Sequence, residues 1–131
     1  MTSGMRKKYR KRENSLITAV QLDLDTVGFQ YHKWGGTQSC KAGDWLVSNG
    51  EDCYTIDKDS FQQTYTQISP GLYQKTQIIW AEIADDCGKV ATKEGSSEYQ
   101  QGDYLVSNNA DGTDAYAISK KTFEVSYEPA E

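Results

Sequence analysis

The chain has 131 residues, a formal net charge of −5 at pH 7, three cysteines and a hydrophobic content of 37%. No stretch approaches the roughly 20 apolar residues of a membrane-spanning helix, and no apolar segment follows the positive charges near the N-terminus, so we expect neither a membrane span nor a signal peptide. The odd cysteine count, without Cys-x-x-Cys spacing, indicates reduced thiols and a cytoplasmic location.

Residues 1–14 carry six basic side chains and one acidic one, a net charge of +5, whereas residues 15–131 carry 8 basic and 18 acidic side chains, a net charge of −10. The sequence therefore predicts a basic N-terminal arm that contacts nucleic acid or an acidic partner through counterion release. A solvated tail, or a segment folded against the acidic body, is the alternative. The basic residues are Arg6, Lys7, Lys8, Arg10, Lys11 and Arg12.

The rest of the chain contains two copies of one sequence unit. Residues 43–49 read Gly-Asp-Trp-Leu-Val-Ser-Asn, and residues 102–108 repeat them with Tyr in place of Trp. A shift of 59 positions lays 17–49 on 76–108, and three additional residues in the second copy then raise the shift to 62. We expect a first β repeat at 15–67, a linker at 68–75 and a second repeat at 76–131. Because a unit of about sixty residues barely buries a core of its own, the two copies should pack together or on another subunit.

Both copies predict the same elements in the same order, beginning with alternating apolar strands and ending in a short helical turn. The predicted strands, by copy, are Ser15–Leu24, Gly28–Trp34, Trp45–Val47 and Cys53–Ile56, then Thr76–Ile83, Lys89–Lys93, Tyr104–Val106 and Ala115–Ile118. The fold class is mainly β, with two similar small antiparallel β lobes, each closed by a helical turn and packed together.

Asp57 and Ser119 follow the last predicted strand of each copy and suit the N-cap of a helix. Phe61 and Tyr65, like Phe123 and Tyr127, are four residues apart and should present one aromatic face to the sheet. Pro70 and Pro129 are expected to stop these turns. Asp44 and Asp103, directly after the repeated glycine, most simply bond nearby backbone N–H groups in an Asx-type turn.

The order of motifs in the first copy resembles a family. A Lys-Lys-Tyr-Arg-Lys opening, then Ile-Thr-Ala-Val-Gln, Gly-Asp-Trp-Leu-Val and a closing Phe-x-x-x-Tyr is similar to the small PGDYG-type proteins of bacteriophages and prophages. The chain departs from that pattern at Ala42, where the family usually has Pro, and it lacks a helical insert after the first strand. The resemblance implies a phage or bacterial origin, hence a bacterial host cell, and no established reaction.

Catalytic candidates are few. His32, the single histidine, has Cys40 or Ser39 as a conceivable nucleophile partner. Asp23 and Asp25 would lie on one face of a strand and offer a carboxylate pair. Structural roles suit all of these residues better, so we predict no catalytic residue, no metal site and no cofactor.

Binding is the remaining class of function. Large aromatic rings left at a groove between two lobes would form a stacking platform, although an aromatic core explains the same composition. We predict a non-enzymatic binding module for a small nucleotide-like ligand or a host protein at an interlobe or intersubunit groove. The alternatives are a nucleic-acid-associated protein and a structural oligomer or virion component, and a homo-oligomer is expected. The candidate ligand-binding residues are Trp34, Trp45, Tyr104 and Trp80.

Overall fold

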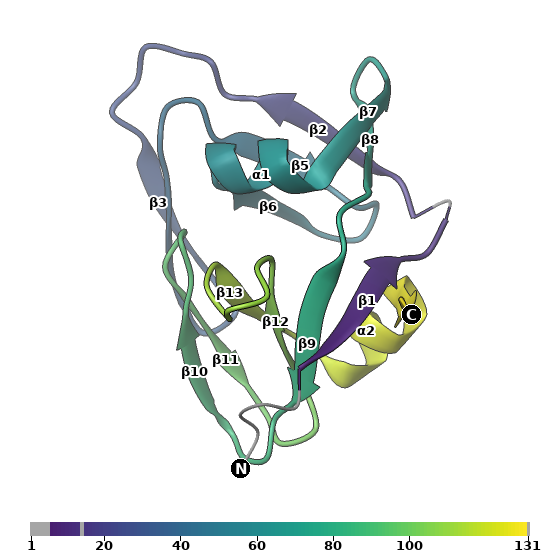
Figure 1. The fold of residues 1–131 in the computed structure, drawn as a ribbon. Coiled ribbons are helices and arrows are strands. Elements are labelled where there is room, and N and C mark those ends of the chain that lie inside the picture. The colour runs from purple at the N-terminus through teal and green to yellow at the C-terminus, as the bar shows by residue number, and fades with distance from the viewer. Residues whose placement is uncertain (1–5, 14, 131) are drawn as a thin grey trace.

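The computed structural model describes residues 6–13 and 15–130, and within these ranges the chain forms two five-stranded antiparallel sheets, two short helices and two separate hairpins (Figure 1). The mainly β fold class predicted from the sequence is confirmed. We call the part built on the first sheet the first lobe and the part built on the second sheet the second lobe.

The first lobe contains a sheet with the strand order β6-β5-β2-β8-β7, covered by α1, and a hairpin of β3 and β4. The bounds of these elements are β2 Ile17–Gln21, β3 Phe29–Lys33, β4 Gly36–Cys40, β5 Trp45–Ser48, β6 Cys53–Ile56, α1 Lys58–Thr64, β7 Tyr65–Ser69 and β8 Leu72–Lys75.

The second lobe repeats this plan with the strand order β13-β12-β9-β1-β14, the helix α2 and a hairpin of β10 and β11. The bounds are β1 Lys7–Lys11, β9 Ile79–Ile83, β10 Gly88–Ala91, β11 Ser96–Tyr99, β12 Tyr104–Ser107, β13 Ala115–Ile118, α2 Lys120–Ser126 and β14 Tyr127–Pro129.

The two lobes exchange one strand. β1 precedes β2 in the chain but pairs with β9 and β14 of the second lobe, where Tyr9 lies opposite Ile79. β8 precedes β9 but pairs with β2 and β7 of the first lobe, where Tyr73 lies opposite Ile17. The predicted basic arm and the predicted linker therefore each contribute an inner strand, and neither segment is a free connection.

Strand pairing also corrects the alignment of the repeats. Ala19 lies opposite Val47 in the first sheet and Ala81 opposite Val106 in the second, so the first strands are related by 62 positions and not by 59. The shift of 59 holds for the hairpins, where Phe29 pairs with Cys40 and Gly88 with Tyr99. The gapless alignment of 17–49 was thus wrong at its start, because the loop before β3 is three residues longer than the loop before β10.

Each helix begins and packs as its sequence predicts. Asp57 accepts bonds from the backbone of Asp59 and Ser60, and Ser119 accepts one from Thr122, so both N-caps are confirmed. Phe61 stacks on Tyr65 at 4.6 Å, and the equivalent rings in the second lobe stack at 4.8 Å. The predicted role of the prolines was wrong, because α1 and α2 end where the next residue takes an extended backbone and enters β7 or β14.

The repeated Gly-Asp corner ties a turn to the start of each helix. Asp44 accepts bonds from the backbone N–H groups of Lys41 at 2.8 Å and Lys58 at 3.0 Å. Asp103 accepts the equivalent bonds from Gln100 and Lys120 at 2.8 and 3.1 Å. The Asx-type interpretation is confirmed and extended, since each carboxylate also holds the first residue of a helix.

Candidate functional site: the interlobe cavity

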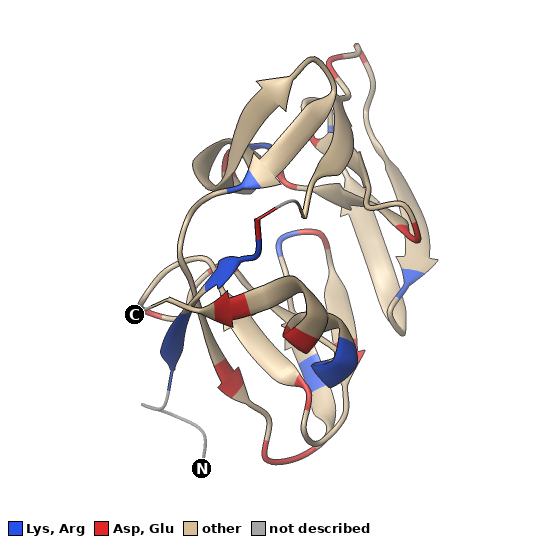
Figure 2. Ribbon diagram, turned by 90° about the vertical axis from the view of Figure 1, so that its right-hand side faces the viewer, with Lys and Arg blue, Asp and Glu red and all other residues tan. Residues whose placement is uncertain are grey.

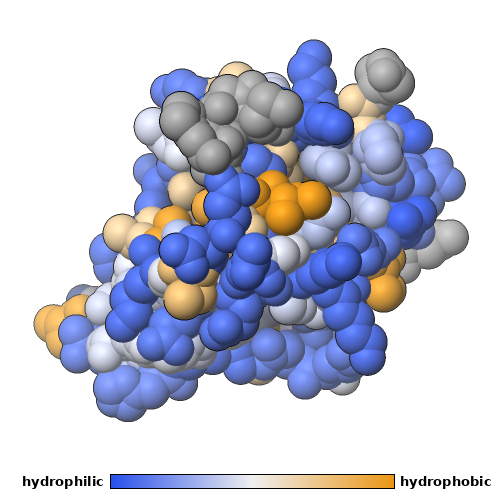
Figure 3. Space-filling model, turned by 90° about the horizontal axis from the view of Figure 1, so that it is seen from below, coloured by the Kyte–Doolittle hydropathy of each residue, from blue (hydrophilic) through white to orange (hydrophobic). Residues whose placement is uncertain are grey.

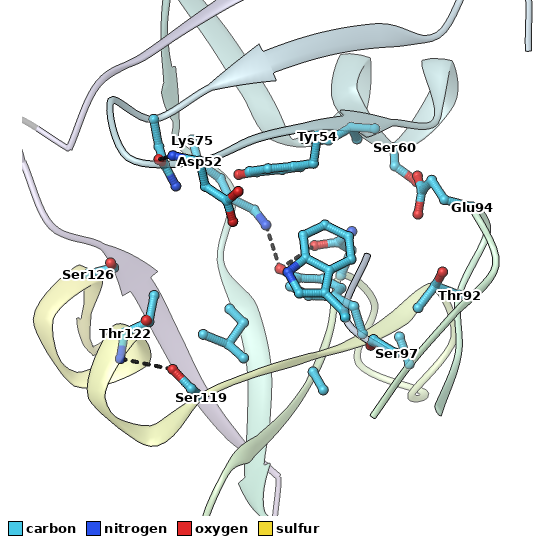
Figure 4. A pocket seen from close by; sticks show the side chains of 18 of the residues that line it. Asp52, Tyr54, Ser60, Lys75, Thr92, Glu94, Ser97, Ser119, Thr122 and Ser126 are labelled. Atoms are coloured by element: carbon cyan, nitrogen blue, oxygen red, sulfur yellow. Dashed lines mark hydrogen bonds between the residues drawn. The ribbon is translucent and has the colours of Figure 1, made fainter. Parts of the chain in front are cut away.

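A cavity of about 490 Å³ lies between the lobes and is lined by side chains of both repeats. Figure 4 shows Tyr54 and Lys75 on the side of the first lobe and Ser119, Thr122 and Ser126 at α2 of the second. Much of the lining comes as equivalent pairs, which gives the cavity an approximate twofold character. These pairs are Tyr54 and Tyr116, Ile56 and Ile118, Ser60 and Thr122, Thr64 and Ser126, Tyr65 and Tyr127, and Lys11 and Lys75.

Lys75 is the most unusual side chain of this lining. It is only 6% exposed, and its Nζ donates a 2.6 Å hydrogen bond to Oη of Tyr116 across the lobe boundary. Nζ also stands over the rings of Tyr65, Tyr116 and Tyr127, at 5.0 to 6.0 Å from their centroids. Burial lowers the pKa of Lys75 from 10.5 to about 7, with Lys11 lowering it further and Asp114 opposing the shift. The rings stabilise the cation, but they do not replace the water it has lost.

The tyrosines around Lys75 form a hydrogen-bonded and aromatic wall. Burial raises the pKa of Tyr54 to about 12 and raises the pKa of Tyr65, Tyr116 and Tyr127 well above 10, so all four are neutral at physiological pH. From Lys75 the chain of bonds continues, since Tyr116 donates to Asn108 Oδ1 at 3.5 Å. The wall therefore offers neutral hydroxyl groups and ring faces.

Three of the acidic side chains that line the cavity are engaged by the protein itself. Glu94 accepts a 2.6 Å bond from the backbone N–H of Asp57, and burial raises the pKa of the Glu94 carboxyl. Asp114 accepts bonds from Ser60 Oγ at 2.6 Å and from Asn108 at 2.9 Å. Asp52 is ion-paired with Lys33. The bond between Asp57 and Glu94 and the bond between Ser60 and Asp114 join the lobes.

Trp34 is the one predicted aromatic candidate that the structure places at the cavity. It lies in the β3–β4 turn with a φ of 58°, is 42% exposed, and meets the ring of Tyr54 edge to face at 5.5 Å. Trp45 and Tyr104 belong instead to the cores, where they stack on Phe61 at 4.1 Å and Phe123 at 3.9 Å. Trp80 lies on β9 opposite Ser107 and Lys8, outside the cavity lining.

The basic residues of the predicted arm are dispersed along the second lobe (Figure 2). Lys7, Lys8 and Arg10 are exposed on β1, while Lys11 turns to the cavity with its Nζ 5.1 Å from the ring centroid of Tyr127. The remaining two basic residues, Arg12 and Arg6, contact other parts of the second lobe. Arg12, like Arg10, pairs with Glu128, and Arg6 lies against Gly112.

The conceivable catalytic pairs do not come together. His32 bonds Thr37 across its hairpin at 3.2 Å, whereas Cys40 is buried opposite Phe29 at the other end. Asp23 and Asp25 lie beyond the end of β2 in an exposed loop, so the prediction that they share a strand face was wrong. Among the residues the structure describes, no group of three His, Cys, Asp or Glu side chains is placed to hold a metal ion.

The outer surface offers little continuous apolar area on the face seen in Figure 3, where small hydrophobic patches are separated by hydrophilic side chains. Neither α1 nor α2, the helices of the described ranges, is long and apolar enough to cross a membrane. The predicted homo-oligomer stays a prediction.

Comparison with models of protein families, with characterised proteins and with solved structures finds no match. The resemblance to PGDYG-type proteins therefore stays a prediction. Sequence reasoning missed Lys75, Tyr54 and Tyr116 as site residues. The available signal was the Tyr-x-Lys spacing shared by residues 9–11 and 73–75, which is visible once the exchanged strands are compared.

Proposed function

We propose that this protein is a non-enzymatic binding module that holds a small, ring-bearing, nucleotide-like ligand in the interlobe cavity. The observation that carries the proposal is the cavity itself, because about 490 Å³ falls within the roughly 300–1,000 Å³ typical of small-molecule sites. A concave site of this size suits a small molecule better than a host protein.

The composition of the lining supports a ligand with both a ring and polar groups. Trp34 in the β3–β4 turn and Tyr54 on β6 offer aromatic surface to the cavity, and the hydroxyl side chains of Thr122 and Ser126 on α2 also line it. Pockets that bind small molecules combine such apolar walls with a few placed polar groups. A phage or prophage origin is a separate proposal, which rests on the sequence resemblance alone.

The experiment is an NMR titration of the ¹⁵N-labelled protein with a panel of nucleosides, nucleotides and small aromatic acids. We expect shifts of the Trp34 indole resonance and of cavity residues on both lobes. Trp34→Ala should weaken the binding about fivefold or more, because stacking on one aromatic side chain contributes about 1–3 kcal/mol and about 1.4 kcal/mol corresponds to tenfold. Phe29→Ala removes another exposed ring of the same hairpin, 51% exposed and outside the cavity lining, and should leave affinity unchanged. A panel without any shift at the cavity would refute the proposal.

A further inference from the structure

We propose that the interlobe cavity contains an oxyanion subsite, in which Lys75 and Lys11 together bind the carboxylate or phosphate group of a ring-bearing ligand beside Tyr127. This inference rests on the proposed function and specifies the chemistry of its ligand. It starts from two lysines that line the cavity, Lys75 buried and Lys11 half-buried.

The two lysines are neighbours because of the strand exchange. Lys11 pairs with Tyr127 where β1 meets β14, and Lys75 pairs with Tyr65 where β8 meets β7. Both ammonium groups stand over the same ring, with Nζ of Lys11 5.1 Å and Nζ of Lys75 6.0 Å from the centroid of Tyr127. Equivalent residues of the two repeats thus both lie near the Tyr127 ring at the boundary of the lobes.

Neither amine has a carboxylate partner within the described part of the chain. The basic side chains that do form ion pairs there, Arg10, Arg12, Lys33, Lys41 and Lys93, are all at least a quarter exposed. Asp114 acts on Lys75 from a distance, and its Oδ2 is engaged by Ser60, Asn108 and Lys93. Two desolvated cations near each other, without a counter-ion, are costly to bury.

An oxyanion bound between them would reduce this cost, since its negative charge offsets theirs and its oxygens accept hydrogen bonds from the amines. The groups that face Lys75 are Lys11 from β1, Tyr65 from β7, Tyr116 from β13, Tyr127 from β14 and Asp114 from the β12–β13 loop. The tyrosines are neutral, so the charged groups that act on Lys75 are Lys11 and Asp114, with opposite signs. Burial lowers the pKa of Lys11 as well as that of Lys75, and a bound anion would raise both values again.

The test compares two anions with their neutral counterparts: AMP against adenosine for phosphate, and nicotinate against nicotinamide for carboxylate. Isothermal titration at pH 8 gives the affinity, and repetition in buffers of different ionisation enthalpy counts the protons taken up. We expect at least one anion to bind ten or more times tighter than its neutral counterpart. Because an amine with a pKa near 7 is mostly neutral at pH 8, binding should draw close to one proton into the site.

Lys75→Met and Lys11→Met should each weaken anion binding at least tenfold, and Lys75→Met should abolish most of the proton uptake. Lys121→Met makes the same change of charge on the exposed surface of α2 and should alter neither quantity. Lys75→Met is expected to fold, because a long apolar side chain replaces a buried charge at similar volume.

The possible results separate the two proposals. If the neutral ring compounds bind at the cavity and the anions have no advantage, the oxyanion subsite is refuted and the binding module stands. If an anion binds but Lys75→Met neither weakens binding nor reduces proton uptake, the subsite is likewise refuted. If no compound shifts the Trp34 resonance at 10 mM, both proposals fail.

Discussion

The buried carboxylate of Asp44 offers the most specific prediction about stability. Asp44 has no solvent exposure and accepts the backbone N–H groups of Lys41 and Lys58. A hydrogen bond to a charged group contributes about 1.5–3 kcal/mol to stability. A buried N–H group left without an acceptor loses this contribution in full, because no water replaces the acceptor. Asp44→Ala removes both acceptors at once, so we expect the free energy of unfolding to fall by about 3–5 kcal/mol.

Asp103 supplies the comparison, because it makes the equivalent two backbone bonds in the second lobe but is partly exposed, and among the described residues only Asp44 of the two is also ion-paired, with the exposed Lys41 Nζ at 3.2 Å. Water can replace the lost carboxylate there, so Asp103→Ala should cost only about 1–2 kcal/mol. Asp44→Asn, which keeps one acceptor oxygen, should fall between Asp44→Ala and the unchanged protein.

Urea denaturation followed by tryptophan fluorescence and by far-ultraviolet circular dichroism measures these differences. If Asp44→Ala costs no more than Asp103→Ala, burial does not set the strength of the repeated corner and the reasoning is wrong. A loss below about 0.5 kcal/mol for both variants would show that neither carboxylate holds its helix.

Three further predictions concern the cores, the exchanged strand and pH. Phe61→Ala and Phe123→Ala remove rings that are 2% and 1% exposed, and thermal or urea unfolding should show a loss of about 3–5 kcal/mol for each, against little change for the exposed Val125→Ala. Deleting residues 1–12 removes β1 from the middle of the second sheet, so hydrogen exchange should show lost protection of β9 and β14; retained protection of both strands would contradict the strand exchange. Between pH 7 and 9 the unfolded chain keeps a proton on Lys75, whose ordinary pKa is 10.5, whereas the folded chain releases it near 7. The free energy of unfolding should therefore rise by about 2 kcal/mol across this window in the unchanged protein and stay flatter in Lys75→Met, and an equal rise in both would refute the assignment.

Local patterns in the sequence were sufficient to predict most of the helices and strands. The return strands Cys53–Ile56 and Ala115–Ile118, the caps Asp57 and Ser119 and the aromatic pairs of the helices all follow from contacts within a few residues, and the structure has them as predicted. Alternation, capping and i, i+4 spacing act over such short distances that they can be read before the fold is known.

Pairing between distant segments could not be read in this way. The local sequences of Lys7–Lys11 and Leu72–Lys75 do not determine which sheet each strand joins, because the same alternating residues would suit either sheet. For the same reason Trp45 and Tyr104 looked like site residues, although the strands carrying them turn both rings into a core.

The sequence by itself determined a duplicated β unit with its corners, caps and helical turns, since those depend on neighbours in the chain. Only the tertiary structure decided that the leading strands change places and bring Lys11, Lys75 and their tyrosines to the boundary of the lobes. The physical reason is that burial, and with it the lowered pKa of Lys75, depends on residues more than forty positions away in the chain, such as Tyr116 and Tyr127.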